Sequence, residues 1–164
     1  MPSHDITFRE EPRPSDAAAV RSIVDSTGFF RPDEVDVAVE LVQERLAKGP
    51  ASGYHFVFAE RGGEVLGYTC YGPIACTLHS YDLFWIAVRN DARGMGLGKQ
   101  LMERTESRIA EMGGQRVYAE TSSTPRYEPT RGFYLRCGYI EAAFLEDFYA
   151  PGDGRVTYLK VVGQ

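Results

Sequence analysis

The chain has 164 residues, of which 43% are hydrophobic, and a formal net charge of −5 at pH 7. A chain of this length buries enough apolar surface to fold as one domain without metals or disulfides. The acidic balance argues against nucleic acid or an anionic membrane as the main partner, because both require a basic surface.

The sequence shows no signal for export or membrane insertion. Its longest unbroken apolar run, residues 83–88, is far shorter than the roughly 20 residues of a membrane-spanning helix. Residues 1–16 lack the apolar core of a signal peptide. The cysteines are odd in number and have no C-x-x-C spacing, which favours reduced thiols over a disulfide framework or a zinc site. We therefore expect a cytoplasmic protein without a metal site.

The first half of the chain predicts a strand, two helices and a β-hairpin. Ser15 or Asp16 caps the first helix, and Pro32 stands at the start of the second. Residues 54–71 alternate with a β period around a Gly-Gly turn. The predicted elements are a strand at 6–9, helices from 15 or 16 to 28 and from 32 to 49, and strands at 54–60 and 65–71.

The clearest strand, residues 81–88, is apolar on both faces, which is typical of a central strand. A turn with alternating glycines, Gly94, Gly96 and Gly98, joins it to an amphipathic helix. Glycine lets the backbone approach a ligand, and the first amides of a helix have no intrahelical acceptor. The turn therefore predicts a site for an anion such as a phosphate or pyrophosphate.

Two common phosphate-binding motifs do not fit this turn. A dinucleotide-type G-x-G-x-x-G starting at Gly94 requires glycine where Lys99 stands. A Walker A loop requires glycine at Arg93 and Ser or Thr at Gln100. The pattern that remains is Arg93-x-x-Gly96-x-Gly98 after a strand.

The rest of the chain predicts a β-α-β unit followed by a helix and a hairpin. The helix after the turn ends at Gly113, and its crossover to the next strand is expected to be right-handed, which makes the two strands parallel. The remaining elements are a strand at 116–121, a short helix at 129–136, and paired strands at 139–149 and 155–162.

Two motifs, in this order, resemble the GNAT N-acetyltransferase superfamily. Arg93-x-x-Gly96-x-Gly98 resembles its acetyl-coenzyme A loop, Gln/Arg-x-x-Gly-x-Gly/Ala, and residues 131–139 resemble its Phe-Tyr-x-x-x-Gly-Phe/Tyr segment. The order of predicted elements matches the family over nearly the whole chain. Residues 120–123 and 147–153 resemble a bacterial branch of the family.

The resemblance implies an α/β fold of the GNAT type and a single domain over residues 1–164. This fold has a central mixed, mostly antiparallel sheet, flanked by helices, in which the parallel fourth and fifth strands splay apart. The implied reaction moves the acetyl group of acetyl-coenzyme A to a primary amine by direct attack in a ternary complex, without a metal or a covalent enzyme intermediate.

The resemblance also implies which residues bind the donor. The amides of the glycine turn cradle the pyrophosphate beside Arg93, and the backbone of the central strand pairs with the pantetheine arm. Tyr127 stands where many relatives carry an asparagine. The implied cofactor-binding residues are Ile86, Ala87, Val88, Arg93, Gly94, Met95, Gly96, Leu97, Gly98, Lys99, Tyr127 and Phe133.

Tyr134 falls on the position of the family's general acid, where its phenol donates a proton to the departing thiolate. The general base has no family signature. Asp82 and Glu120, near the ends of strands, are the candidates for it. His55 and His79 carry imidazoles, a side-chain type that often transfers protons, but lone histidines are more often structural.

Other functions stay open at this point. One is a noncatalytic acyl-coenzyme A-binding or sensing module, and another is a longer acyl donor. A third is a nucleotide-dependent phosphotransferase, but the glycine turn lacks the lysine and Ser/Thr pair that such an enzyme requires. Small amines, amino acids, antibiotics and protein termini all remain candidate acceptors, and the last two strands are a candidate homodimer interface.

Overall fold

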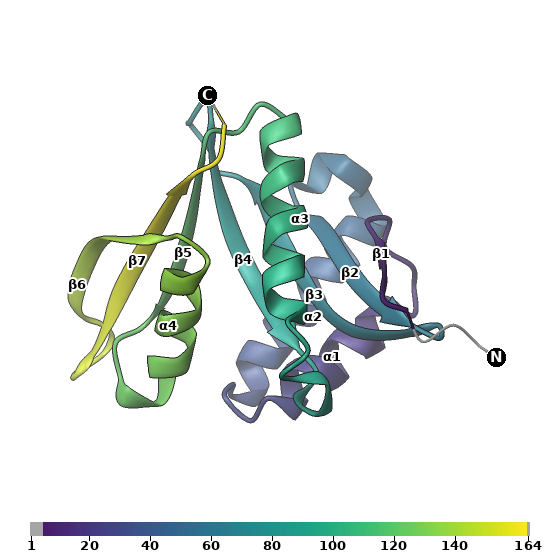
Figure 1. The fold of residues 1–164 in the computed structure, drawn as a ribbon, viewed down its shortest axis with the longest axis horizontal. Coiled ribbons are helices and arrows are strands. Elements are labelled where there is room, and N and C mark those ends of the chain that lie inside the picture. Colours follow the sequence, from purple (N-terminus) through teal and green to yellow (C-terminus); the bar gives the residue numbers. More distant parts are fainter. Residues whose placement is uncertain (1–4, 164) are drawn as a thin grey trace. The chain divides into compact units, whose positions relative to one another are not determined.

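The computed structural model describes residues 5–163, which form seven strands and four α-helices (Figure 1). The strands are β1 (Thr7–Arg9), β2 (His55–Arg61), β3 (Glu64–Pro73), β4 (Ser80–Val88), β5 (Arg116–Ser122), β6 (Ile140–Ala150) and β7 (Asp153–Val161). The helices are α1 (Asp16–Ser26), α2 (Pro32–Lys48), α3 (Leu97–Glu111) and α4 (Glu128–Arg136), with short 3-10 turns η1 (Gly49–Ser52), η2 (Asn90–Ala92) and η3 (Pro125–Tyr127).

All seven strands belong to one sheet in the order β1-β2-β3-β4-β5-β7-β6. β4 and β5 run parallel, and the paired neighbours β1–β2, β2–β3, β5–β7 and β6–β7 run antiparallel. This mixed, mostly antiparallel sheet confirms the predicted fold class, and β4 is the central strand. In the described chain, β4 and β5 are paired only from Ser80–Asp82 to Arg116–Tyr118, so residues 84–88 lie beyond their paired stretch.

The chain divides into two compact units, which are described separately. The first contains residues up to 72 and residues 84–105, and the second contains residues 73–83 and those from 106 onward. β4 passes from the second unit to the first after Leu83, and α3 passes from the first to the second after Thr105.

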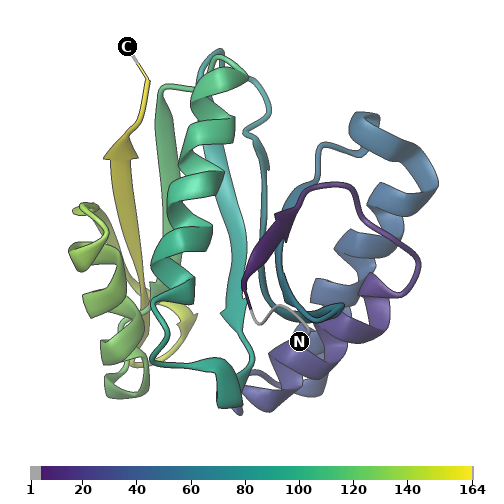
Figure 2. The same cartoon turned by 45° about the vertical axis from the view of Figure 1, so that its right-hand side comes forward.

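The core of the first unit lies between the α1–α2 pair and one face of β2 and β3 (Figure 2). Alternate strand residues point to this face, because side chains of a strand alternate between its two sides. Each fully buried apolar side chain of this kind contributes about 1.5–3 kcal/mol relative to an exposed one. The buried core residues are Val20, Ile23, Val24, Val35, Ala38, Val42, Phe56, Phe58, Tyr68, Cys70 and Ala87.

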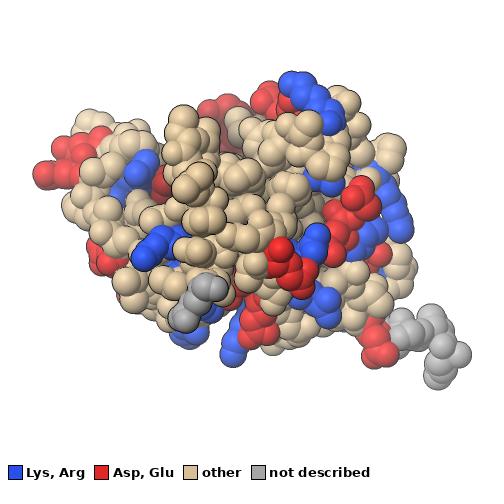
Figure 3. Space-filling view, turned by 90° about the horizontal axis from the view of Figure 1, so that it is seen from above, with Lys and Arg blue, Asp and Glu red and all other residues tan. Residues whose placement is uncertain are grey.

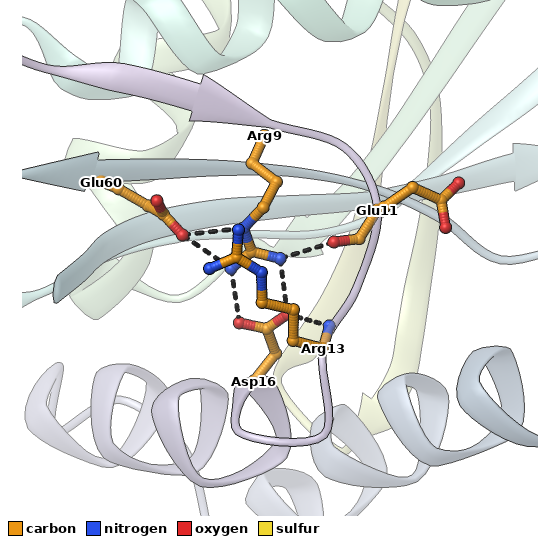
Figure 4. A network of polar contacts seen from close by, with 5 residues as sticks. All are labelled: Arg9, Glu11, Arg13, Asp16 and Glu60. Atoms are coloured by element: carbon orange, nitrogen blue, oxygen red, sulfur yellow. Dashed lines mark hydrogen bonds and ion pairs between the residues drawn. The ribbon is translucent and has the colours of Figure 1, made fainter. Parts of the chain in front are cut away.

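A buried ion cluster fixes the start of α1 (Figure 4). Arg9 donates from both terminal nitrogens to Asp16, at 2.8 Å each, and from Nε to Glu60 at 2.8 Å. Asp16 is 1% exposed and also accepts the backbone N–H of Arg13. These contacts raise the pKa of Arg9, chiefly through its hydrogen bond to Asp16. Of the two predicted caps, Ser15 occupies the N-cap position but its side chain makes no cap hydrogen bond, and Asp16 is the first residue of the helix.

A cavity of about 290 Å³ lies beside this ion cluster. Its lining comes from the start of α1, the β2–β3 turn and Arg89. Among its lining residues we find none of the predicted catalytic or cofactor-binding residues. The cavity therefore plays no part in the site described below.

In the second unit, α4 packs on one face of β5 and β7 (Figure 1). Tyr134 of α4 lies with its ring centroid 5.4 Å from that of Tyr158 on β7. β6 is the edge strand, and its residues are exposed along its whole length. Near its end Asp147 has a φ of 54° and accepts the N–H of Gly152, which shapes the β6–β7 turn.

Figure 3 shows acidic and basic side chains interspersed over the face that it views. Within residues 5–163, no helix combines the length and the hydropathy needed to cross a bilayer. All three cysteines are in the described part of the chain, and no disulfide joins them. The cytoplasmic location stays a prediction.

Candidate functional site

The glycine turn between β4 and α3 has the backbone geometry of an anion-binding loop. Gly94 and Gly96 have φ values of +83° and +72°, in the left-handed region that favours glycine. A Cβ atom at either position would meet no atom within 4 Å, so the backbone conformation, and not the available space, requires glycine. The turn is exposed, and the N–H of Gln100, which bonds to the carbonyl of Gly96 at 3.2 Å, begins the helical ladder. The preceding amides of α3 are thus available to an external acceptor.

The side chains around this turn are mostly exposed, in keeping with a ligand-binding surface. Arg93 lies 5.8 Å from the ring centroid of Phe29, and Met95 accepts a contact from Arg61 at 3.9 Å. Lys99 is exposed, whereas Leu97 is 2% exposed and anchors the first turn of α3. Buried Leu97 therefore anchors the turn, while Arg93 and Lys99 face solvent.

The three strand residues predicted to pair with a ligand arm lie just before this turn. Ala87 belongs to the core of the first unit, and Ile86 and Val88 are half-buried. All three lie beyond the stretch of β4 that pairs with β5. Their position is consistent with the predicted use of this strand edge by an amide-bearing ligand.

The second unit brings the two candidate bases together. Asp82 pairs with Tyr118, and Glu120 follows two residues later on β5, so both carboxylates point to the same face of the sheet. Asp82 is half-buried, and burial together with the charge of Glu120 raises the pKa of its carboxyl, against the opposing charge of Arg155. Glu120 is ion-paired with Arg155 at 3.3 Å.

Tyr134, a residue of α4, packs against the opposite face of the same sheet. Tyr158, against which it packs, pairs with Ala119, the neighbour of Glu120, and therefore points away from both carboxylates. Tyr134 is 5% exposed, and burial raises the pKa of its phenol well above its ordinary value. The phenol therefore holds its proton at neutral pH.

A buried network behind Tyr134 was not predicted from the sequence. Glu106 of α3, 8% exposed, accepts hydrogen bonds from the Tyr139 hydroxyl and from Lys160 Nζ, each at 2.9 Å. Lys160 also donates to the carbonyl of Cys137 at 2.7 Å, and the N–H of Tyr139 donates to the carbonyl of Tyr134 at 3.0 Å. The network fixes the end of α4. Its only sequence signal is that Glu106 follows Thr105 on the predicted apolar stripe of α3.

The loop between β5 and α4 contains the remaining predicted residues. Arg131 donates to the carbonyls of Ser122 and Thr124, at 2.8 Å each, and so orders this loop. Tyr127, at the end of η3, is half-buried and donates its N–H to Thr124. Phe133 is half-buried with its ring centroid 5.7 Å from that of Tyr134.

Neither histidine joins the candidate bases. His55 Nδ1 lies 3.2 Å from Arg45 Nη1, and His79 Nδ1 lies 3.1 Å from the carbonyl of Gly113. Both contacts are of the kind that structural histidines make. Asp82 and Glu120 thus remain the candidates for the base.

Comparison with known proteins gives one consistent result. The model of the acetyltransferase (GNAT) family matches residues 19–139. An uncharacterized N-acetyltransferase of Chlorobaculum tepidum is 26% identical over 92% of this chain and 84% of its own length. A crystal structure assigned to the GNAT acetyltransferases, from Desulfovibrio desulfuricans, is 46% identical, covers 96% of this chain and 99% of its own, and has a TM-score of 0.95. An aminoglycoside 6'-N-acetyltransferase complexed with coenzyme A shares the fold, at 20% identity over 95% of this chain and 97% of its own, with a TM-score of 0.78.

Proposed function

Because the chain belongs to the acetyltransferase (GNAT) family and is an acyltransferase, we propose that it moves the acetyl group of acetyl-coenzyme A to a primary amine. The observation that carries the donor assignment is the exposed turn at Gly94 and Gly96, whose left-handed glycines lead into the free amides of α3. Such an arrangement suits a pyrophosphate. The coenzyme A complex of a structure with the same fold supports this choice of donor.

In this proposal each part of the donor has its own residues. The amides of residues 94–99 hold the pyrophosphate, with Arg93 and Lys99 supplying positive charge near it. The backbone of residues 86–88 pairs with the amide groups of the pantetheine arm. Tyr127 and Phe133, beside the start and middle of α4, contribute further contacts to the cofactor.

The chemical step needs one base and one acid. The neutral amine attacks the thioester carbonyl, a C–N bond forms, and the C–S bond breaks as the tetrahedral intermediate collapses. Asp82 accepts the proton that the nitrogen loses, and Tyr134 donates a proton to the leaving thiolate.

Asp82 is the preferred base of the two carboxylates. Its carboxylate makes no hydrogen bond or ion pair with any residue from 5 to 163 that would compete with a substrate proton, whereas the Glu120 carboxylate is paired with Arg155. A raised pKa also makes the Asp82 carboxylate a stronger base. Glu120 then acts on the reaction through its charge, by keeping that pKa high.

Release of free thiol across a panel of amines tests the proposed function. Acetyl-coenzyme A is expected to stabilise the fold whether the protein is an enzyme or only a binding module, so thermal shifts do not separate these functions. Turnover does separate them. If no amine releases thiol faster than acetyl-coenzyme A hydrolyses alone, the protein is a binding or sensing module and the proposed reaction is wrong.

The charge of Glu120 is expected to set the acid limb of the pH profile of kcat/KM. Asp82 must be ionised to act as the base, and Glu120 opposes that ionisation. In Glu120→Gln the pKa of Asp82 falls, the carboxylate persists to lower pH, and the acid limb moves to lower pH. Arg155→Gln is expected to move the limb the other way, because Arg155 favours the ionised form. Acid limbs that coincide in all three proteins would remove Asp82 as the base.

The glycine turn is expected to control the affinity for the donor. Alanine at Gly96 disfavours the left-handed backbone by about 1–2 kcal/mol. We expect Gly96→Ala to raise the KM for acetyl-coenzyme A about tenfold, in line with that penalty. Gly62→Ala is the matched control, since Gly62 has a φ of +59° and equally free space but lies in the β2–β3 turn. Equal changes of KM in both variants would show a general effect on folding and not a donor site.

A further inference from the structure

In the second unit, one face of the sheet carries the carboxylates of Asp82 and Glu120. Two polar groups on this face lack hydrogen-bond partners within the described residues. The hydroxyl of Thr157, a residue only 7% exposed, and Nε of Arg155 are both enclosed without a partner in the described chain. Thr157 pairs directly with Glu120 in the β5–β7 register, and Arg155 lies two residues before it on the same face. Both groups therefore lie on the face that carries Asp82 and Glu120.

Arg155 differs from more buried arginines, and from Arg89, which is similarly exposed but donates from Nε to Asp91. Arg9, Arg45 and Arg131 each donate at least two hydrogen bonds to carboxylate or carbonyl oxygens. Arg155 is 25% exposed, yet its contacts within residues 5–163 are the 3.3 Å ion pair with Glu120 and the ring of Phe148 at 4.6 Å. A guanidinium has five donors and suits a planar anion. The exposed part of the Arg155 guanidinium is thus available to a ligand.

The charges and surfaces around these groups match one class of ligand. Asp82 and Glu120 are negative and Arg155 is positive, so this face of the sheet carries charges of both signs on neighbouring strands. Phe148 and Tyr149, half-exposed at the end of β6, add an aromatic wall beside Arg155. A zwitterion presents an ammonium group and a carboxylate to such a face together.

We propose, resting on the function proposed above, that the acceptor is an amine that carries a carboxylate, as an amino acid does, and that Arg155 and the Thr157 hydroxyl bind that carboxylate. The amine then lies toward Asp82 and Glu120, which are its base and its counter-charge. The carboxylate accepts hydrogen bonds from Arg155 and Thr157 and gives the buried hydroxyl the partner it lacks.

Acceptors without a carboxylate fit this face less well. A neutral amine leaves the Thr157 hydroxyl without a partner, and a buried polar group in that state is unfavourable. A polycation with several ammonium groups is repelled by the positive charge of Arg155. These two classes are the alternatives that the experiment separates from a zwitterion.

The test compares each of the twenty amino acids with its own primary amide as acceptor, by thiol release. The pair shares amine and side chain and differs in the carboxylate. We expect at least one amino acid to exceed its amide in kcat/KM, and Arg155→Gln to lower this preference about 10- to 100-fold, the range for a lost charged hydrogen bond. The KM for acetyl-coenzyme A is expected to stay within about twofold.

Two further variants separate binding from folding. Thr157→Val keeps the shape of the side chain and is expected to lower the preference for the acid while leaving the fold at least as stable, because it removes an unsatisfied buried hydroxyl. Arg116→Gln, an exposed arginine on β5, is the matched control and is expected to leave the preference unchanged. If Thr157→Val is destabilised and keeps the preference, the hydroxyl has a structural role and the proposal is wrong.

The remaining outcomes are equally decisive. Turnover of amides or polyamines as fast as of amino acids overturns the carboxylate site but leaves the acetyltransferase function intact. If no acceptor is turned over, the acetyltransferase proposal fails, and calorimetry of amino acids with the coenzyme A-saturated protein decides the binding site. If no amino acid binds more tightly than its amide, the carboxylate site is wrong. If an amino acid binds more tightly than its amide and Arg155→Gln removes the difference, the carboxylate site is supported.

Discussion

Tyr134→Phe is expected to lower kcat by about 100-fold or more, at the lower end of the range for general acid catalysis. The substitution removes the proton donor for the leaving thiolate and keeps the ring that packs against Tyr139 and Tyr158. Because burial raises the pKa of this phenol, the donor stays protonated through neutral and mildly alkaline pH. Thiol release under saturating substrates measures the effect.

Tyr158→Phe is the matched control for this variant. Tyr158 is 3% exposed and belongs to the same ring cluster, but it has no role in the proposed reaction. We expect its kcat to stay within about threefold of the parent, as for a change that removes one hydroxyl from the packing. The KM for acetyl-coenzyme A is expected to be similar in all three proteins. If Tyr134→Phe turns over as fast as Tyr158→Phe, Tyr134 is a packing residue and another group protonates the thiolate.

Lys160→Met is expected to reduce the free energy of unfolding by about 2–3 kcal/mol, because it leaves the Glu106 carboxylate buried without its counter-charge. The Lys160 side chain is 29% exposed and that of Glu106 is 10% exposed, so the expected loss lies below that of a fully buried pair. The carbonyl of Cys137 loses a donor as well. Urea denaturation, followed by circular dichroism, measures the change.

Two variants show whether that loss comes from the uncompensated charge. Adding Glu106→Gln to Lys160→Met removes the charge while keeping an acceptor for the Tyr139 hydroxyl, and is expected to recover more than half of the stability. Lys48→Met breaks an exposed pair with Glu44 and is expected to leave the free energy of unfolding nearly unchanged. If Lys160→Met is no more destabilised than Lys48→Met, the network contributes little to the fold.

The sequence predicted the elements well, because each depends on local pattern. The helix beginning at Pro32, the hairpin around Gly62 and the apolar strand ending at Val88 occur where periodicity and turn residues place them. The conformation of the glycine turn at Gly94 and Gly96 was also predictable, since only glycine adopts those dihedral angles readily. The start of α1 at Asp16 was predicted as well, but the pairing of Asp16 with Arg9 was not, because it joins a helix to a separate strand.

The candidate site likewise has parts that the sequence predicted and parts that it did not. By itself the sequence determined where the glycine turn and Tyr134 stand in the chain, because each belongs to a contiguous motif whose spacing is visible. Only the tertiary structure decided which groups meet: strand register brings Asp82, Glu120, Arg155 and Thr157 onto one face, and Glu106 meets Lys160 from a distant strand. Side chains far apart in sequence become neighbours through pairing and packing, and no local pattern in a single sequence reports that.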